Sequence, residues 1–250
     1  MDEFQLKRPP VSRVVLSIFF ELDFALQVTQ VSEFVADVKR DFPNVSERPP
    51  SLSWKNGDDG PVGIVRPDGQ WPFPTLVFSS DSEYSLLIHS DRLLLTWESA
   101  GGEYPGYKAM KEELNVRFAS FNAALEGLGN LSIGRFQCLY DNSVLSMSAV
   151  QLATGVLTSW KYEGENSDAN EYVGARLEYR HQDRTDNLNC TVAVDGSPSD
   201  GELSLWLKAS RDRPDDEPNS IDGLDIAHQE LIDRFRQSTS EELRREWGEI

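Results

Sequence analysis

The sequence is poor in cysteine and in long hydrophobic runs, and both shortages exclude classes of protein. Cys138 and Cys190 are the only two cysteines, too few for a disulfide framework or a cysteine-rich metal site. Both lie in apolar, strand-like stretches, where a free cysteine usually behaves as a small buried hydrophobe. No stretch approaches the roughly 18 apolar residues of a membrane span, and the N-terminus lacks the apolar core of a signal peptide. We therefore expect a cytoplasmic protein without membrane association and without a cofactor.

Positive charge is also scarce, because 24 Lys and Arg residues stand against 42 Asp and Glu residues, a formal net charge of −18. Such a charge repels phosphate backbones, so direct binding of nucleic acid is not expected. It suits solubility, a cationic ligand or a basic protein partner. Six Trp, seven Tyr and twelve Phe residues argue against disorder, because disordered chains are poor in aromatics.

Periodicity and turn signals predict a chain of mixed strands and helices. Strands are expected at Val11–Glu21, Ser51–Trp54, Thr75–Ser80, Tyr84–His89, Arg92–Glu98, Leu131–Tyr140, Tyr172–His181, Leu188–Val194 and Glu202–Ser210. Helices are expected at Val31–Phe42, within Tyr104–Gly129, and from Leu224 toward the C-terminus. The segment Val144–Trp160 has no decided pattern, although a short helix at Ser148–Ala153 fits it.

Each half of the chain reads as a strand, a crossing segment, three antiparallel strands and a helix. The order predicts an α+β fold, with mainly antiparallel sheet and two long helices packed on one face. Two similar β-α-β-β-β-α lobes are one arrangement that fits, with an N-terminal lobe at residues 1–129 and a C-terminal lobe at 130–250. One continuous domain is the other. The two halves share too little sequence identity to establish a duplication.

The stretch "LDIAHQELIDRF" places a histidine and several carboxylates on one helix. At 100° per residue, His228 falls in the middle of the apolar side, between Leu224 and Leu231, while Glu230 and Asp233 point roughly opposite. A zinc deaminase needs a downstream cysteine pair, and a zincin needs a second histidine where position 232 is Ile. We expect a core histidine that fastens the helix, with a ligand-contacting histidine as the alternative.

The C-terminal "QSTSEELRREW" predicts a second, short helix. Ser238 with Glu241, or Thr239 with Glu242, has the spacing of a capping box. We expect Trp247 to pack back onto the fold. The alternative is a partner-binding Trp247, because tryptophan is enriched at the centres of protein interfaces.

No sequence motif for catalysis was found. The glycine-rich "GLGNLSIG" follows a helix rather than a strand and lacks a Gly-Lys-Ser/Thr ending, and no Gly-x-Ser-x-Gly elbow occurs. With 42 carboxylates in the chain, a pair of them close together carries almost no information. The sequence thus favours a protein that is not an enzyme, although residues that meet only in space could still form an active site.

Several short motifs together resemble a sporadically distributed family of uncharacterised prokaryotic proteins. The members open with "PPV" and "FE", carry "DRL…W" and "YP.Y" in the centre, and close with "AH..I...F" and "WG". The matching residues here are Pro9, Pro10, Val11, Phe20, Glu21, Phe42, Pro43, Asp91, Arg92, Leu93, Trp97, Tyr104, Pro105, Tyr107, Tyr140, Asn142, Ala227, His228, Ile232, Phe235, Trp247 and Gly248. This chain departs from the family at Leu22 and Asp23, where Pro-Leu is usual. The patchy distribution implies mobile loci, such as defence or toxin-linked loci.

Charge and the missing motifs favour a non-enzymatic, acidic protein-interaction or accessory component with a protein partner. The alternative is a small-molecule binding domain with a pocket between sheet and helix, since such sites are mostly apolar with a few convergent polar groups. The candidate ligand-binding residues for that alternative are His228, Tyr140, Asn142, Trp97 and Arg92.

Overall fold

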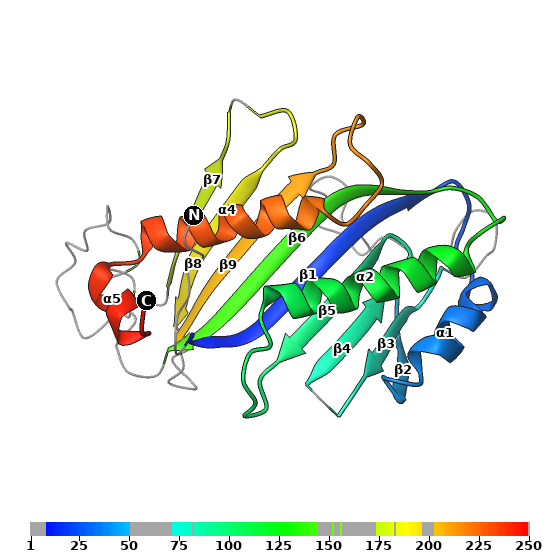
Figure 1. Ribbon diagram of the computed structural model, residues 1–250, viewed down its shortest axis with the longest axis horizontal. Coiled ribbons are helices and arrows are strands. Elements are labelled where there is room, and N and C mark those ends of the chain that lie inside the picture. The colour runs from blue at the N-terminus through cyan, green and yellow to red at the C-terminus, as the bar shows by residue number, and fades with distance from the viewer. Residues whose placement is uncertain are drawn as a thin grey trace. The chain divides into compact units, whose positions relative to one another are not determined.

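The computed structural model shows an α+β protein built on one large antiparallel sheet (Figure 1). It describes residues 9–50, 72–81, 83–144, 152, 156, 174–182, 184–196 and 203–249. The strands are β1 (Val11–Leu22), β2 (Asn44–Arg48), β3 (Thr75–Ser79), β4 (Tyr84–Ile88), β5 (Arg92–Glu98), β6 (Leu131–Val144), β7 (Gly174–Arg180), β8 (Asn189–Gly196) and β9 (Leu203–Asp212). The helices are the 3-10 turn η1 (Val28–Val31), α1 (Ser32–Val38), α2 (Tyr107–Ala124), α4 (Gly223–Ser238) and α5 (Glu241–Glu246).

Most expected elements are confirmed, because β-branched and aromatic residues do form the strands predicted from them. The strand β2 was not expected, because the sequence reading assigned these residues to a loop. All five of its residues are exposed, and only Val45 is apolar. Its pairing with β3, from Asn44 opposite Ser79 to Arg48 opposite Thr75, makes it a strand, so tertiary hydrogen bonding overrides its weak local preference. The strand expected at Ser51–Trp54 lies outside the described residues. So do residues 145–173 apart from 152 and 156, which include the short helix expected at Ser148–Ala153.

The strand order is β2-β3-β4-β5-β1-β6-β9-β8-β7. The chain divides into two compact units, which we call unit 1 (residues 1–15, 136–215 and 222–250) and unit 2 (residues 16–135 and 216–221). The boundary between the units falls after Val15 within β1 and before Phe136 within β6, so each of these strands contributes to both units. The strand that precedes α2, β5, lies beside β1, the first strand of the N-terminal half. In the same way, β9, which precedes α4, lies beside β6, the first strand of the C-terminal half.

Aromatic side chains fill the core of unit 2. Phe121 of α2 packs against Phe20 of β1 and Phe34 of α1, with ring centroids 5.3 and 5.4 Å apart. Phe34 also meets Phe78 of β3 edge to face at 6.4 Å. All four rings are buried, so burial of α1 and α2 against the strands accounts for this helical layer.

The helix α4 covers β8 and β9 in unit 1. It begins at Gly223, where a Cβ atom would lie 2.1 Å from the ring of Phe136 on β6. Only glycine allows the helix start to come this close to the strand. One residue on, the Leu224 carbonyl accepts a long 3.8 Å contact from Cys138 Sγ. Cys138 and Cys190 are both fully buried, as the sequence predicts.

The two longest described helices are α2 with 18 residues and α4 with 16. The structure confirms that both exist, but it does not confirm that they pack on one face of the sheet. The described residues include no helix with the length and apolar character needed to cross a membrane.

Candidate functional site

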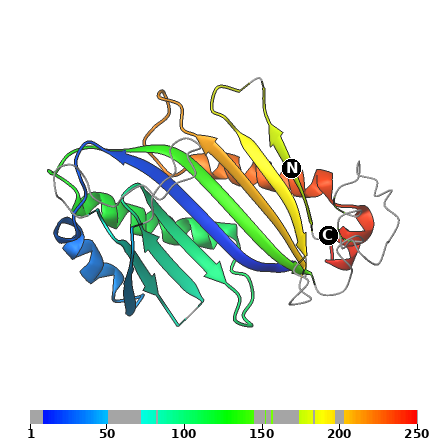
Figure 2. The same ribbon diagram turned by 180° about the vertical axis from the view of Figure 1, so that it is seen from behind.

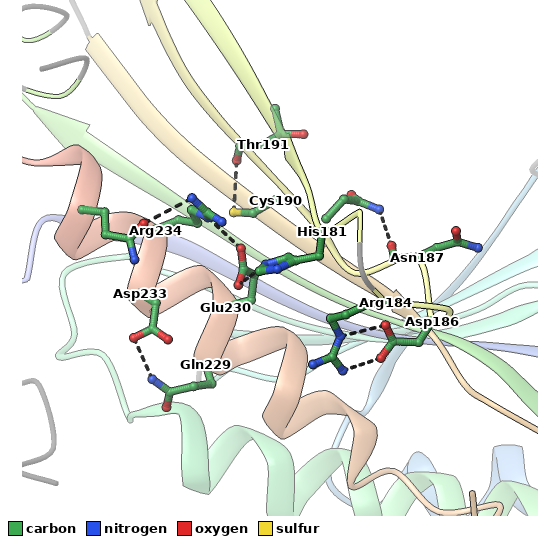
Figure 3. Close-up of polar contacts among 12 residues, drawn as sticks. His181, Arg184, Asp186, Asn187, Cys190, Thr191, Gln229, Glu230, Asp233 and Arg234 are labelled. Carbon is green, nitrogen blue, oxygen red and sulfur yellow. Dashed lines mark hydrogen bonds and ion pairs between the residues drawn. The ribbon is translucent and has the colours of Figure 1, made fainter. Parts of the chain in front are cut away.

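Charged side chains of unit 1 gather where the end of the β7–β8 hairpin meets α4 (Figure 3). We call this group the hairpin cluster, and its members are His181, Arg184, Asp186, Arg211, Glu230 and Arg234. The hairpin supplies the first three, β9 supplies Arg211, and α4 supplies Glu230 and Arg234.

Glu230 is the buried carboxylate on the helix side of the cluster. Its side chain is 9% exposed and lies 2.9 Å from Nε2 of His181 and 2.7 Å from Nε of Arg234. This corrects the expectation that Glu230 points away from the sheet. The buried side of α4 is centred nearer Ala227 than the sequence reading placed it, so Glu230 falls at its margin. Asp233, on the outer side, accepts a hydrogen bond from Gln229 at 3.0 Å.

Asp186 is the second buried carboxylate, and two arginines neutralise it. Arg184 binds both of its oxygens, at 2.9 and 2.5 Å, and Arg211 Nε binds Oδ2 at 2.6 Å. The hydrogen bonds from Arg184 lower the pKa of Asp186 well below its ordinary value of 3.8, although burial opposes them. Asp186 and Arg211 are 5% and 3% exposed, so this pair is almost fully removed from water.

Two less polar side chains, Tyr179 and Cys190, lie beside the cluster. The guanidinium of Arg234 lies 4.5 Å from the centroid of the Tyr179 ring on β7, a cation–π contact. Below it, Cys190 directs its Sγ to the Thr191 carbonyl at 3.8 Å. Burial, with a smaller contribution from the charge of Glu230, raises the pKa of the Cys190 thiol to about 12. The thiol therefore stays protonated and is not a nucleophile.

His181 is the most chemically versatile member. The ionised carboxylate of Glu230 can only accept a hydrogen bond, so we assign the donated proton to Nε2 of His181. In the neutral ring, Nδ1 then carries no proton and can accept one. None of the described residues bonds to Nδ1, and the side chain is 33% exposed. The arrangement orients an imidazole through a carboxylate. Among the described residues, however, no three His, Cys, Asp or Glu side chains group to hold a metal ion.

Three of the residues predicted from the sequence lie in unit 1, and two of them are in contact. Tyr140 is buried on β6, and its ring centroid lies 5.8 Å from that of His228 on α4. His228 is half-buried, so it faces the sheet as expected but is not enclosed. Asn142 is buried two residues along β6, where its amide donates to the Leu205 carbonyl at 2.7 Å. That bond ties β6 to β9.

The other two predicted residues, Trp97 and Arg92, lie on β5 in unit 2 and point to opposite faces of the sheet. Trp97 is 2% exposed; its indole donates to Glu83 at 3.1 Å. The burial of alternate residues along β5 puts Arg92 on the other face, where its guanidinium lies 5.6 Å from the Phe19 ring. The two side chains therefore cannot line one pocket.

The C-terminal turn differs from the predicted capping. Ser240, rather than Ser238 or Thr239, is the N-cap of α5, and its hydroxyl accepts from Leu243 N at 3.3 Å. Thr239 instead donates to the Phe235 carbonyl at 2.6 Å, which ends α4. Trp247 is 8% exposed, with its ring 5.7 Å from that of Phe235, so the expected packing onto the fold is confirmed.

The sequence reading missed Trp206 on β9, a strand that lies in front of α4 in Figure 2. Its indole donates to Asp195 on β8 at 2.5 Å, and the Arg176 guanidinium of β7 lies 5.4 Å from its ring. Trp206 stands opposite Ala193, whose small side chain leaves the ring half-exposed. The alternation along β9 could have revealed it, because Leu203, Leu205 and Leu207 all face inward and so turn Trp206 outward.

Comparison with known proteins gives no relative: no family model, no curated protein and no solved structure matches the chain.

Proposed function

We propose that this chain is a non-enzymatic, cytoplasmic protein-interaction component whose acidic surface binds a basic protein partner. The observation that carries the proposal is the net charge of −18, which attracts a basic partner over long distances and speeds its association. The proposal includes membership of the prokaryotic family described above and a role in a mobile defence or toxin-linked locus. It also includes two related lobes, with α2 and α4 as corresponding helices on one face of the sheet.

The hairpin cluster supports a binding role over catalysis. Asp186 is neutralised by Arg184 and by Arg211 of β9, so it ties the hairpin to β9. Glu230 is bonded to His181 and Arg234, so it ties α4 to the hairpin. A general acid or base works best with a pKa near the operating pH, and the pKa of Asp186 is shifted in the opposite direction.

Trp206 is the centre of the surface that we propose for the partner. Tryptophan and arginine dominate the binding energy of protein interfaces, and here Arg176 stacks on a half-exposed Trp206. Asp195 and Asp141 add carboxylates on the same face of the sheet, where Asp195 accepts from Trp206 and Asp141 pairs with Arg13 at 3.1 Å. Trp247, for which partner binding was the alternative expectation, is buried and packs against Phe235, so we place the partner surface elsewhere.

The test is affinity capture from a native lysate of the source organism, with the wild type, Trp206→Ala and Val116→Ala as baits. Val116 is the matched control, because it is 55% exposed on α2 in unit 2. We expect the wild type and Val116→Ala to retain a basic protein in stoichiometric amount that elutes with salt, and Trp206→Ala to lose it. A clean monomer without a partner at physiological salt, or equal retention by all three baits, would contradict the proposal.

A small-molecule site between β6 and α4 is the second candidate function. The contact between the Tyr140 and His228 rings favours it, because His228 remains half-exposed beside a buried aromatic. A thermal-shift screen of the wild type against metabolites and nucleotides tests this site. A ligand that raises the melting temperature of the wild type, and raises that of Asn142→Asp less, would support it. If His228→Ala responds to that ligand as strongly as the wild type, the site is elsewhere.

A further inference from the structure

The strand β7 of unit 1 is the last in the order of the described strands. In the described part of the chain, β8 pairs with β7 on one side and β7 ends the strand order (Figure 1). Its inward-facing residues Ala175, Leu177 and Tyr179 are only half-buried, whereas their partners across β8 are buried. An edge of this kind is a template for another strand.

The register of the β7–β8 pair shows which backbone groups face the open edge. His181 N–H donates to the Leu188 carbonyl at 3.2 Å, and 181 lies opposite 188 in the continuation of the β7–β8 register. Hydrogen-bonded pairs alternate along an antiparallel ladder, so the odd-numbered residues of β7 bond to β8. The even-numbered residues Arg176, Glu178 and Arg180 therefore direct their N–H and C=O groups away from β8.

The sequence of β7, "GARLEYR", complements itself when it is read in the opposite direction about Leu177. In an antiparallel pair centred there, Arg176 lies opposite Glu178 of the second copy, and Glu178 lies opposite Arg176 of the second copy. Opposite charges placed across two strands stabilise the pair, while like charges destabilise it. On the other face, the small Ala175 lies opposite the large Tyr179, and the two copies of Leu177 meet on the axis.

The hydrogen bonding fits the same register. Arg176 and Glu178, the residues that would form the hydrogen-bonded pairs, are those whose backbone groups face the open edge. Leu177 and Ala175 would then occupy the non-hydrogen-bonded positions, where side chains come closest. Backbone bonding, charge and side-chain size thus agree on one register, as a two-fold interface requires, because the same patch must complement itself.

We propose that two copies of this chain associate through β7, in antiparallel register about Leu177, so that the sheet continues from one copy to the other. An interface built on one short strand is smaller than the roughly 1,600 Å² of a standard stable complex, so the dimer is reversible. The dimer does not rest on the partner proposed above. Arg176 belongs to both surfaces, so Glu178→Arg is the variant that tests the dimer without changing the contact between Arg176 and Trp206.

Analytical ultracentrifugation over a range of concentrations tests the dimer. The wild type is expected to approach twice the chain mass of 28.2 kDa as concentration rises. Glu178→Arg and Arg176→Glu each create two like-charge contacts across the axis and should remain monomeric. A mixture of these two variants should dimerise again, because every cross-strand pair then carries opposite charges. This rescue also shows that the variants are folded.

Glu47→Arg is the matched control, since it reverses a charge on the exposed strand β2 at the other end of the sheet and should leave the dimer intact. In the wild type, amide exchange measured by NMR should slow with concentration at residues 176, 178 and 180. The amides of 175, 177 and 179 should be protected at every concentration. A monomer at all concentrations, a mixture that stays monomeric, or protection without this alternation would overturn the proposal.

Discussion

The charge of Asp186 contributes strongly to the stability of unit 1, and Asp186→Asn measures that contribution. The substitution keeps the shape of the side chain but removes the charge that pairs with Arg211, which is 3% exposed. Removing one partner of a buried ion pair costs about 3–5 kcal/mol, because an uncompensated charge stays buried. At about 2–4 °C per kcal/mol for a chain of this size, the melting temperature should fall by about 10 °C.

The pH dependence gives this prediction its sign. The folded-state pKa of Asp186 lies below its ordinary value of 3.8, so the stability from its ionised form is fully present above pH 3.8. That contribution is lost as the pH falls through the lower, folded-state pKa. The difference between wild type and Asp186→Asn should therefore be constant from neutral pH down to about 4 and shrink only below it.

Urea unfolding followed by tryptophan fluorescence measures this difference. Glu241→Gln is the matched control, because Glu241 forms a 3.0 Å pair with Arg245 in which the two side chains are 69% and 74% exposed. An exposed pair of this kind contributes about 0–1 kcal/mol. If Asp186→Asn unfolds within about 1 kcal/mol of the wild type, the buried pair does not hold the hairpin, and the argument from burial is wrong.

Three other substitutions or labels test the packing of unit 1. Gly223→Ala should destabilise by about 1–3 kcal/mol, because its Cβ would lie 2.1 Å from the Phe136 ring, while Gly134→Ala, with nothing within 4 Å, should change the melting temperature little. Asn142→Ala should cost about 1–3 kcal/mol in urea unfolding, since it leaves the buried Leu205 carbonyl without its 2.7 Å partner; an unchanged midpoint would show that water replaces the amide. Cys138 and Cys190 should not react with a thiol reagent until the chain unfolds, because burial raises the pKa of both thiols; rapid labelling of the native chain would contradict their placement.

The regular elements could be predicted because their residues carry the signal locally. Alternating and β-branched residues identify β1 and β9, and apolar residues three or four apart identify α2. By contrast, β2 has one apolar residue in five, and its strand depends on pairing with β3. Such a segment cannot be recognised without knowing its neighbour.

The hairpin cluster could not be predicted for a related reason. His181 and Glu230 are 49 residues apart, and Arg211 is 25 residues from Asp186, so no spacing in the sequence relates them. In a chain with 42 carboxylates, Asp186 and Glu230 look in the sequence like all the others. The sequence did contain the evidence that Arg92 and Trp97 point to opposite faces, because an odd separation along one strand always has that consequence.

The most direct measurement of the proposed function is the affinity of the captured partner for the purified chain as salt concentration rises. If an acidic surface attracts a basic protein, the dissociation constant should increase steeply with salt, chiefly through slower association. Trp206→Ala should weaken binding at every salt concentration without changing the slope. Binding that does not respond to salt, or that Trp206→Ala leaves intact, would contradict the account.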